Sequence, residues 1–489
     1  MRIRTHWKKS LPLLALLGVT PLLWPEPAAR AANPFAARYS HDGSAIFWIL
    51  HISDTHIGAS SIEGPNATPH FEFALGEAFD TIDPVVVVVT GDLCDGSIGA
   101  IPASGQSVEE WTEFRGVVDT AGMTTDIFID VPGNHDGYGE SGNGLTHYLQ
   151  YSLNGSTFSK KTRSMLLSFP FGDYLLYGTS TPNEGSPVFV ESPEFSADEL
   201  TELETELTMH NSATLAFVFG HHRINQPDGS DQAINSLQQH GAFYFHGHLH
   251  EFGTYMQDNI LSGQIDTLGK NDNDNIGVIA VDNDAISYAA SDVTDAWPLI
   301  LVTTPADRRL HSGDVSPYAY DVCNSAVDNP VRTLVFDSGT VTDVSFAVAG
   351  GAAVPMTQDP VEPALWHGVW DTTGLTVGET TLTVTAVGTT TRSQEVHVML
   401  EDVTCPPVNP TPDAGVADAT VEADAEPAGQ DAEPTEDASG PGSDGSLAPG
   451  PKEGGCSCRA GGPLSSPALP ALPVLLLLGL RIALRRRRA

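Results

Sequence analysis

The sequence predicts an α/β domain followed by an all-β region, and two observations predict this order. In the first part of the chain, runs such as residues 45–52 and 84–90 are apolar throughout, and they alternate with helical patterns. Strands that are apolar on both faces are covered on both faces, which is typical of α/β layers. From about residue 298 the pattern changes to short strand-like runs with turn signals and no helix.

The elements of the first domain follow in order along the chain. Helical patterns are expected at residues 71–82 and 107–121. Five strands are predicted within residues 45–54, 84–92, 126–136, 213–222 and 242–250.

Each predicted strand ends in a potential metal ligand. In the last one His248 and His250 stand at alternate positions and point the same way. Ligands bind at the carboxyl ends of strands in such folds, so these side chains are expected to meet there. A single short motif of this kind often occurs in a turn because of its backbone geometry. Five such motifs in order, each at the end of a strand, strongly indicate a metal site. The candidate ligands are Asp54, His56, Asp92, Asn134, His221, His248 and His250.

The order of SDTH, TGD, GNHD, FGHH and HGHLH resembles the calcineurin-like metallophosphoesterase family over residues 46–292. The resemblance implies a two-sheet sandwich flanked by helices, within a domain at residues 45–297. It also implies two ions, one held by Asp54, His56, Asp92 and His250, the other by Asp92, Asn134, His221 and His248, with Asp92 bridging. Mixed oxygen and nitrogen ligands suit iron, manganese or zinc, whereas calcium prefers oxygen alone.

The implied activity is hydrolysis of phosphomonoesters or phosphodiesters by attack of a metal-bridging hydroxide. By the same resemblance His135 is the proton donor to the leaving group and Asp95 is the carboxylate that orients it. A turn or helix-capping role is the alternative for Asp95. The alternative for the whole chain is a surface binding or adhesion protein that uses the domain as a scaffold.

Some residues near the motifs depart from the family pattern. Gly96 follows Asp95 where the protein-phosphatase branch has arginine, which disfavours a phosphoprotein phosphatase of that branch. His222 is an alternative to His221 as the ligand, and Arg223 could contact phosphate or lie on the surface. His51, Asp136 and His246 are expected to pack or to contact a neighbouring carboxylate around the ligands. The run GKNDNDN at 269–275 lacks the Gly and Glu of a calcium loop, so a turn is expected.

The all-β region is expected at residues 298–405 as a small immunoglobulin-like sandwich. A phosphoesterase followed by such a sandwich and a membrane attachment resembles the branch whose animal members are multi-pass membrane proteins. Cys323 and Cys405 bracket this region and could pair in an oxidising compartment, while Cys94 is expected to be a small buried residue.

Both ends of the chain carry targeting patterns. Residues 1–31 resemble an export signal cleaved after Ala31, and a retained anchor is the alternative. Residues 406–455 are rich in Pro, Ala, Asp and Glu and are expected to form a solvated linker. The tail at 456–489 resembles the C-terminal sorting tail of myxobacterial surface proteins. It implies export, processing by a sorting machinery and attachment to the outer membrane surface. The alternative is a plain tail anchor with Arg485 to Arg488 on the cytoplasmic side.

The net charge of −39 narrows the choice of substrate. Only eleven of the 23 Lys and Arg residues lie between the two ends, so the body has no basic groove for a polyanion. We therefore expect a small phosphate ester, and no nucleic-acid polymer, as the partner of the site.

Overall fold

The computed structural model describes residues 45–60, 63–96, 105–139, 145–183, 193–270 and 274–402. The predicted export signal, linker, sorting tail and Cys405 lie outside these residues, so they stay predictions. Within the described residues, no helix has the length and apolar character needed to cross a membrane.

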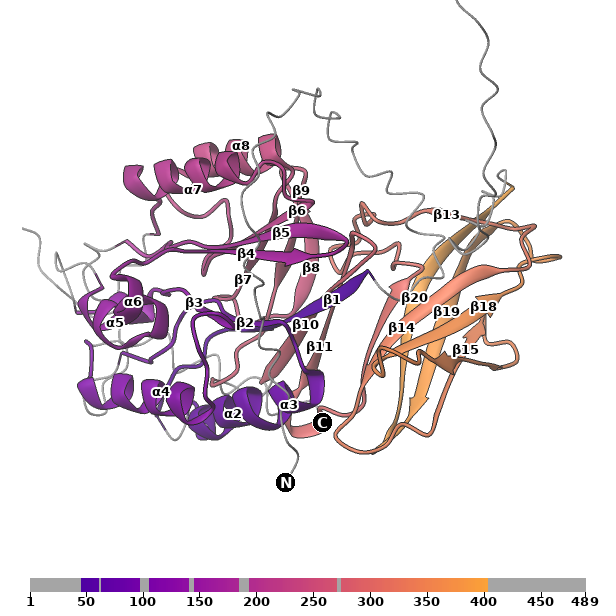
Figure 1. The fold of residues 1–489 in the computed structure, drawn as a ribbon, viewed down its shortest axis with the longest axis horizontal. Coiled ribbons are helices and arrows are strands. Elements are labelled where there is room, and N and C mark those ends of the chain that lie inside the picture. Colours follow the sequence, from indigo (N-terminus) through magenta and orange to yellow (C-terminus); the bar gives the residue numbers. More distant parts are fainter. Residues whose placement is uncertain are drawn as a thin grey trace, which may run out of the picture. The chain divides into compact units, whose positions relative to one another are not determined.

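Two mixed sheets form the centre of the first domain (Figure 1). The first has the order β11-β10-β1-β2-β3, in which β1, β2 and β3 are parallel and β10 and β11 are antiparallel. Its strands are β1 (Ile46–Ile52), β2 (Val86–Val89), β3 (Phe128–Asp130), β10 (Asn275–Asp282) and β11 (Ala285–Asp292). The strands predicted at residues 45–54, 84–92 and 126–136 are confirmed as β1, β2 and β3.

The second sheet has the order β4-β5-β6-β7-β9-β8, with β5, β6, β7 and β9 parallel. Its strands are β4 (Arg163–Phe169), β5 (Gly172–Gly178), β6 (Leu215–Phe219), β7 (Phe243–His246), β8 (Gly253–Gln257) and β9 (Ile260–Gln264). β6 and β7 confirm the strands predicted at residues 213–222 and 242–250.

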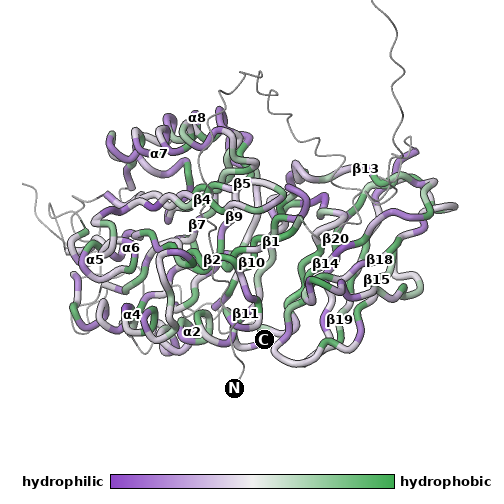
Figure 2. Tube along the Cα trace, viewed as in Figure 1, coloured by the Kyte–Doolittle hydropathy of each residue, from purple (hydrophilic) through white to green (hydrophobic). Residues whose placement is uncertain are grey.

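Hydrophobic side chains from both sheets form the core between them. Phe47, Ile49 and Val88 of the first sheet pack with Phe217 and Phe245 of the second. Figure 2 shows the hydrophobic residues concentrated on these central strands. The other face of each central strand is covered by helices, so both faces are buried, as the uninterrupted apolar runs predicted.

Helices cover the outer faces of the two sheets (Figure 1). On the first sheet lie α2 (Ala67–Phe73), a π-helical turn (Ala74–Ala78), α3 (Phe79–Ile82), α4 (Val108–Thr120), α5 (Thr146–Tyr151) and α6 (Leu153–Phe158). On the second lie α7 (Ala197–Met209) and α8 (Ser230–His240). The first predicted helix starts four residues earlier than expected and contains the π turn.

The sequence explains where α4 begins and which face it buries. The Ser107 side chain accepts a hydrogen bond from the backbone N–H of Glu110, as an N-cap does. Trp111, Phe114 and Val118 recur at helical spacing and are buried in the core.

The C-terminal region consists of two further sheets that share one hydrophobic core. One has the order β12-β14-β18-β17 and the other β13-β20-β19-β15-β16. Their strands are β12 (Leu299–Thr304), β13 (Asp321–Cys323), β14 (Asn329–Phe336), β15 (Asp343–Val348), β16 (Val354–Pro355), β17 (Thr357–Gln358), β18 (Leu365–Trp370), β19 (Gly378–Val387) and β20 (Thr391–Glu401). The predicted strand-rich region is therefore present. Cys323 is disulfide-bonded, and its pairing with Cys405 stays a prediction.

Candidate dinuclear metal centre

The candidate ligands lie in loops that follow β1, β2, β3, β6 and β7, at the edge where the parallel strands end. Asp54, His56, Asp92, His248 and His250 all have positive φ, between 43° and 70°. Non-glycine residues rarely adopt this conformation, and it is typical of functional sites whose surroundings hold the strain. The unusual backbone conformation of these loops therefore helps to position the candidate ligand side chains.

Two glycines let the loops approach each other closely. A Cβ on Gly133 would lie 2.2 Å from the Asp92 Oδ1 atom, and a Cβ on Gly247 would lie 1.9 Å from the Ser53 Oγ atom. Neither distance is possible between non-bonded atoms. The GNHD and HGHLH motifs need glycine at these positions so that Asn134 and His248 can come next to the aspartates.

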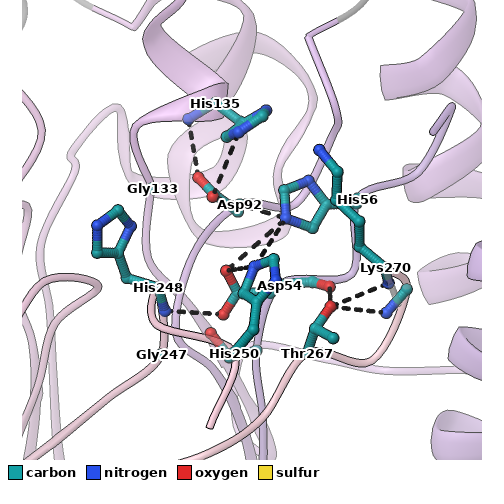
Figure 3. A network of polar contacts seen from close by, with 12 residues as sticks. Asp54, His56, Asp92, Gly133, His135, Gly247, His248, His250, Thr267 and Lys270 are labelled. Carbon is teal, nitrogen blue, oxygen red and sulfur yellow. Dashed lines mark hydrogen bonds and ion pairs between the residues drawn. The ribbon is translucent and has the colours of Figure 1, made fainter. Parts of the chain in front are cut away.

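The first group of donor atoms surrounds Asp54. The His250 Nε2 atom lies 3.1 Å from Asp54 Oδ1 and 3.4 Å from the His56 Nε2 atom. His56 Nε2 lies 3.8 Å from both Asp54 Oδ1 and Asp92 Oδ2. Four ligands about 2.1 Å from one ion lie about 3.4 Å from each other. These separations therefore fit a shared metal ion, and Figure 3 shows the side chains converging.

The second group lies on the other side of Asp92. The His221 Nε2 atom is 3.3 Å from Asp92 Oδ2 and 3.0 Å from Asn134 Oδ1. The His248 ring lies beside the His221 ring, with centroids 5.0 Å apart. Asp92 thus contacts members of both groups, as expected for a carboxylate that bridges two ions. The structure brings all seven predicted ligands together.

Hydrogen bonds hold several ligands in the orientation that metal binding needs. The His221 Nδ1 atom lies 2.7 Å from the Thr90 carbonyl oxygen, so Nδ1 carries the proton and Nε2 presents its lone pair to the site. The Asn134 amide donates to the Tyr138 hydroxyl, which turns Oδ1 toward His221. Such contacts behind a ligand fix its tautomer and direction.

His222, the alternative ligand, is also buried close to the second group. Its Nδ1 atom lies 2.8 Å from the Thr181 hydroxyl, and its ring lies 4.5 Å from the His248 ring, between centroids. His221 reaches both the Asp92 Oδ2 atom and the Asn134 Oδ1 atom. The geometry therefore favours His221 as the ligand.

Buried carboxylates and imidazoles set the electrostatics of this centre. Burial lowers the pKa of His56 to about 4, so its imidazole is neutral and ready to bind an ion at neutral pH. Burial also disfavours charge on His221, but the carboxylates of Asp92 and Asp54 raise its pKa to about 10. The two buried aspartates are thus stabilised by positive charge nearby. A proton on His221 supplies such charge when no metal ion is bound. The donor set fits metal ions.

His135 lies at the edge of the two groups. Its backbone N–H donates to Asp92 Oδ1 at 2.8 Å, and its ring packs edge-to-face on His56 with centroids 4.6 Å apart. Its Nδ1 atom lies 2.7 Å from the carbonyl oxygen of Asp95. Nδ1 therefore carries a proton, and Nε2 is the atom directed toward the site, 4.0 Å from Asp92 Oδ2.

The Asp95 carboxylate lies near His135, as expected, but closer to two other side chains. Its Oδ1 atom lies 3.8 Å from His135 Nδ1 but only 3.3 Å from His56 Nδ1 and 3.0 Å from the Lys270 Nζ atom. The main-chain carbonyl of Asp95 orients His135, and its side chain faces a predicted metal ligand. Motif order could not reveal this, because backbone and side chain of one residue occupy the same place in a sequence pattern.

The residues expected around the ligands have identifiable partners. The Asp136 carboxylate accepts hydrogen bonds from the backbone N–H groups of Leu93, Cys94 and Gly133, and so ties the GDLC and GNHD loops together. His51 contacts the Tyr288 and Thr90 hydroxyls. His246 contacts the Tyr255 hydroxyl rather than a carboxylate. Arg223 is half-buried and donates to the Gln264 side chain.

Lys270 is a residue of the centre that sequence reasoning missed. It stands in the run GKNDNDN, which predicted only a turn. A useful signal was present, because Lys270 is one of few basic residues in an acidic body and follows soon after a strand.

Comparison with known proteins shows which family the first domain is similar to. A family model described as calcineurin-like phosphoesterase matches residues 47–252. Residues 47–252 are therefore similar to calcineurin-like phosphoesterase domains. The matched residues contain all five motifs and all seven candidate ligands, and they end just past His250, which supports the predicted phosphate-ester hydrolase domain.

Two curated relatives match more than half of the chain. Transmembrane protein 62 of Mus musculus is 26% identical over 352 residues, which cover 69% of this chain and 53% of that protein. A protein of Arabidopsis thaliana named as a metallophosphoesterase is 24% identical over 365 residues, covering 62% of this chain and 48% of that protein. This chain matches about half the length of these relatives.

Two solved structures resemble about half of the chain at low identity. A purple acid phosphatase from yellow lupin (Lupinus luteus) aligns with a TM-score of 0.37 and 10% identity, over 52% of each chain. GAP50 of Plasmodium aligns with a TM-score of 0.36 and 11% identity, over 51% of this chain and 85% of that chain.

Proposed function

We propose that the chain is an exported phosphoesterase that hydrolyses small phosphomonoesters or phosphodiesters at a dinuclear metal centre. The single observation that carries this proposal is the position of Asp92, whose Oδ2 atom lies 3.8 Å from His56 Nε2 and 3.3 Å from His221 Nε2. One carboxylate thus joins two groups of donor atoms, which is the arrangement that two neighbouring ions require.

Asp54, His56, Asp92 and His250 would hold one ion, and Asp92, Asn134, His221 and His248 the other. Two bound ions would supply a water of lowered pKa as nucleophile and would neutralise the phosphate oxygens. Iron, manganese and zinc fit this mixture of imidazole, carboxylate and amide donors.

The protein itself supplies the proton for the leaving oxygen. His135 is held by its backbone N–H and by its Nδ1–H, so that Nε2 faces the site. A protonated Nε2 can donate to an alkoxide or phenoxide as the bond to phosphorus breaks. The carbonyl of Asp95 keeps the ring oriented during that transfer.

Export and attachment to the cell surface are part of the proposal. The basic and apolar start of the chain and the apolar, arginine-ended tail support them. The mouse relative is named as a transmembrane protein, which is consistent with an association with membranes. An immunoglobulin-like role for the C-terminal β region and processing of the tail by a sorting machinery are proposed on the same sequence patterns.

Metal content and hydrolysis test this function together. The purified protein, reconstituted with manganese, iron or zinc, should hold two ions per chain by elemental analysis and should cleave aryl and alkyl phosphate esters. Asp92→Asn should lose both ions and all hydrolysis, because that carboxylate contacts both groups. A wild-type protein with one ion or none would overturn the dinuclear model.

A further inference from the structure

The loop that carries Lys270 is held against the first group of ligands. The Thr267 hydroxyl donates to the Asp54 carbonyl oxygen at 2.9 Å, and the Gly269 N–H donates to the same oxygen at 3.0 Å. The backbone N–H of Lys270 in turn donates to the Thr267 hydroxyl at 3.0 Å. Figure 3 shows Thr267 and Lys270 together with Asp54 in this network.

Close backbone contact makes this placement specific. A Cβ on Gly269 would lie 1.9 Å from the Thr55 carbonyl oxygen, so only glycine allows the loop to lie on the segment between Asp54 and His56. Contact with the loop that carries Asp54 and His56 therefore fixes the backbone position from which the Lys270 side chain extends.

From there the ammonium group of Lys270 reaches a buried carboxylate. Its Nζ atom lies 3.0 Å from Asp95 Oδ1, while the Asp95 side chain is fully buried and that of Lys270 is 16% exposed. A buried carboxylate needs a compensating charge and loses its position when that charge is removed. Lys270 provides one such charge.

The same carboxylate oxygen faces His56. Asp95 Oδ1 lies 3.3 Å from His56 Nδ1, on the side of the ring opposite the Nε2 atom that faces Asp54 and Asp92. A carboxylate behind a metal-binding histidine fixes its tautomer and ring direction, and its loss typically lowers metal affinity about 10–100-fold.

We infer that Lys270 is a positioning residue of the metal centre, which holds the Asp95 carboxylate against His56 and thereby keeps His56 Nε2 aimed at the first ion. The inference rests on the proposed function. It assigns Lys270 no contact with the substrate, and its effect passes through Asp95.

Metal affinity of the full-length protein tests this role. Metal-free protein is titrated with Mn²⁺ against a competing chelator, and the two dissociation constants are compared between variants. Lys270→Met should weaken binding of one ion about 10–100-fold, and Lys270→Arg should restore most of it. The matched control is Lys160→Met, because Lys160 pairs with Glu202 on the surface, with its side chain 60% exposed. It should bind both ions as the wild type does.

A double-mutant cycle separates positioning from a general loss of structure. If Lys270 acts through Asp95, then Lys270→Met should have little further effect on affinity in an Asp95→Asn background. Independent, additive losses would overturn the inference. A Lys270→Met variant with unchanged metal affinity and a raised KM would also overturn the inference, because Lys270 would then act on the substrate. If the wild-type protein fails to bind two metal ions, that result counts against the proposed function. The wild type is measured first, so this outcome is known before any variant is compared.

Discussion

Arg332 and Asp282 form a buried, bidentate ion pair between the C-terminal β region and the phosphoesterase domain. The Arg332 Nε atom lies 2.8 Å from Asp282 Oδ2, and its Nη2 atom lies 2.7 Å from Oδ1. Each side chain is 1% exposed. Arg332 belongs to β14 and Asp282 ends β10, whose neighbour β1 leads into the Asp54 loop. The pair therefore ties the β region to the sheet that carries the metal centre.

Removing one partner of this pair should be costly. Arg332→Leu leaves the Asp282 carboxylate buried without its guanidinium, so the free energy of unfolding should fall by about 3–5 kcal/mol in urea denaturation. The double variant Arg332→Met with Asp282→Leu should recover much of that loss, since no charge then stays buried. Arg308→Leu is the control, because Arg308 pairs with Asp321 on the surface, and it should cost at most about 1 kcal/mol. Equal effects of the two single changes would contradict this account.

Gly133→Ala should damage the metal centre although it adds one methyl group. The new Cβ would lie 2.2 Å from the backbone N and the Oδ1 atom of Asp92, so the bridging carboxylate must move. Elemental analysis should find fewer than two ions per chain. The control is Gly116→Ala within α4, where a Cβ meets nothing within 4 Å. That change should keep both ions and raise stability by about 0.5–1 kcal/mol. Two ions bound to Gly133→Ala would show that the loops can adapt.

His135→Ala should slow hydrolysis according to the leaving group. A general acid contributes about 10²–10⁴-fold, and this help matters most when the leaving oxygen is basic. An alkyl phosphate ester should therefore lose activity severely, while an aryl ester with an acidic phenol should be nearly spared. The values of kcat/KM on the two esters are compared, with His210→Ala on the surface after α7 as the control. Equal losses on both esters would mean that His135 supports the ions or the phosphate instead.

The pair of His70 and Asp274 should make stability depend on pH. His70 Nδ1 lies 2.7 Å from Asp274 Oδ2, and hydrogen bonding to Asp274 raises the pKa of His70 above 6.5. A raised pKa in the folded state stabilises the protein below the unfolded pKa, and this contribution is lost as pH rises through the folded pKa.

Urea denaturation of the wild type and of the Asp274→Asn variant, with a chelator present, measures this pH dependence of stability. The difference in free energy of unfolding should be largest below pH 6.5 and should shrink as the pH rises above it. A difference that stays constant across this range would rule out the ionised pair as its source.

Hydrophobic runs and motif order in the sequence determined much of the fold and of the candidate site. Strands that are buried on both faces must be apolar throughout, so β1, β2, β6 and β7 could be predicted from sequence. Parallel strands place their carboxyl ends at one edge of a sheet. A ligand-type residue after each strand was therefore enough to predict that Asp54 and Asp92, which follow neighbouring strands of one sheet, would meet.

Only the tertiary structure decided which atoms face each other at that edge. Asp95 presents its carbonyl to His135 and its carboxylate to His56 and Lys270, because the close approach of several loops sets side-chain directions. The pairing of Arg332 with Asp282 joins residues fifty positions apart in the chain, and no local periodicity records it. Contacts between distant segments depend on the packing of the whole chain. The burial of a strand, by contrast, is recorded in the hydrophobicity of its own consecutive residues.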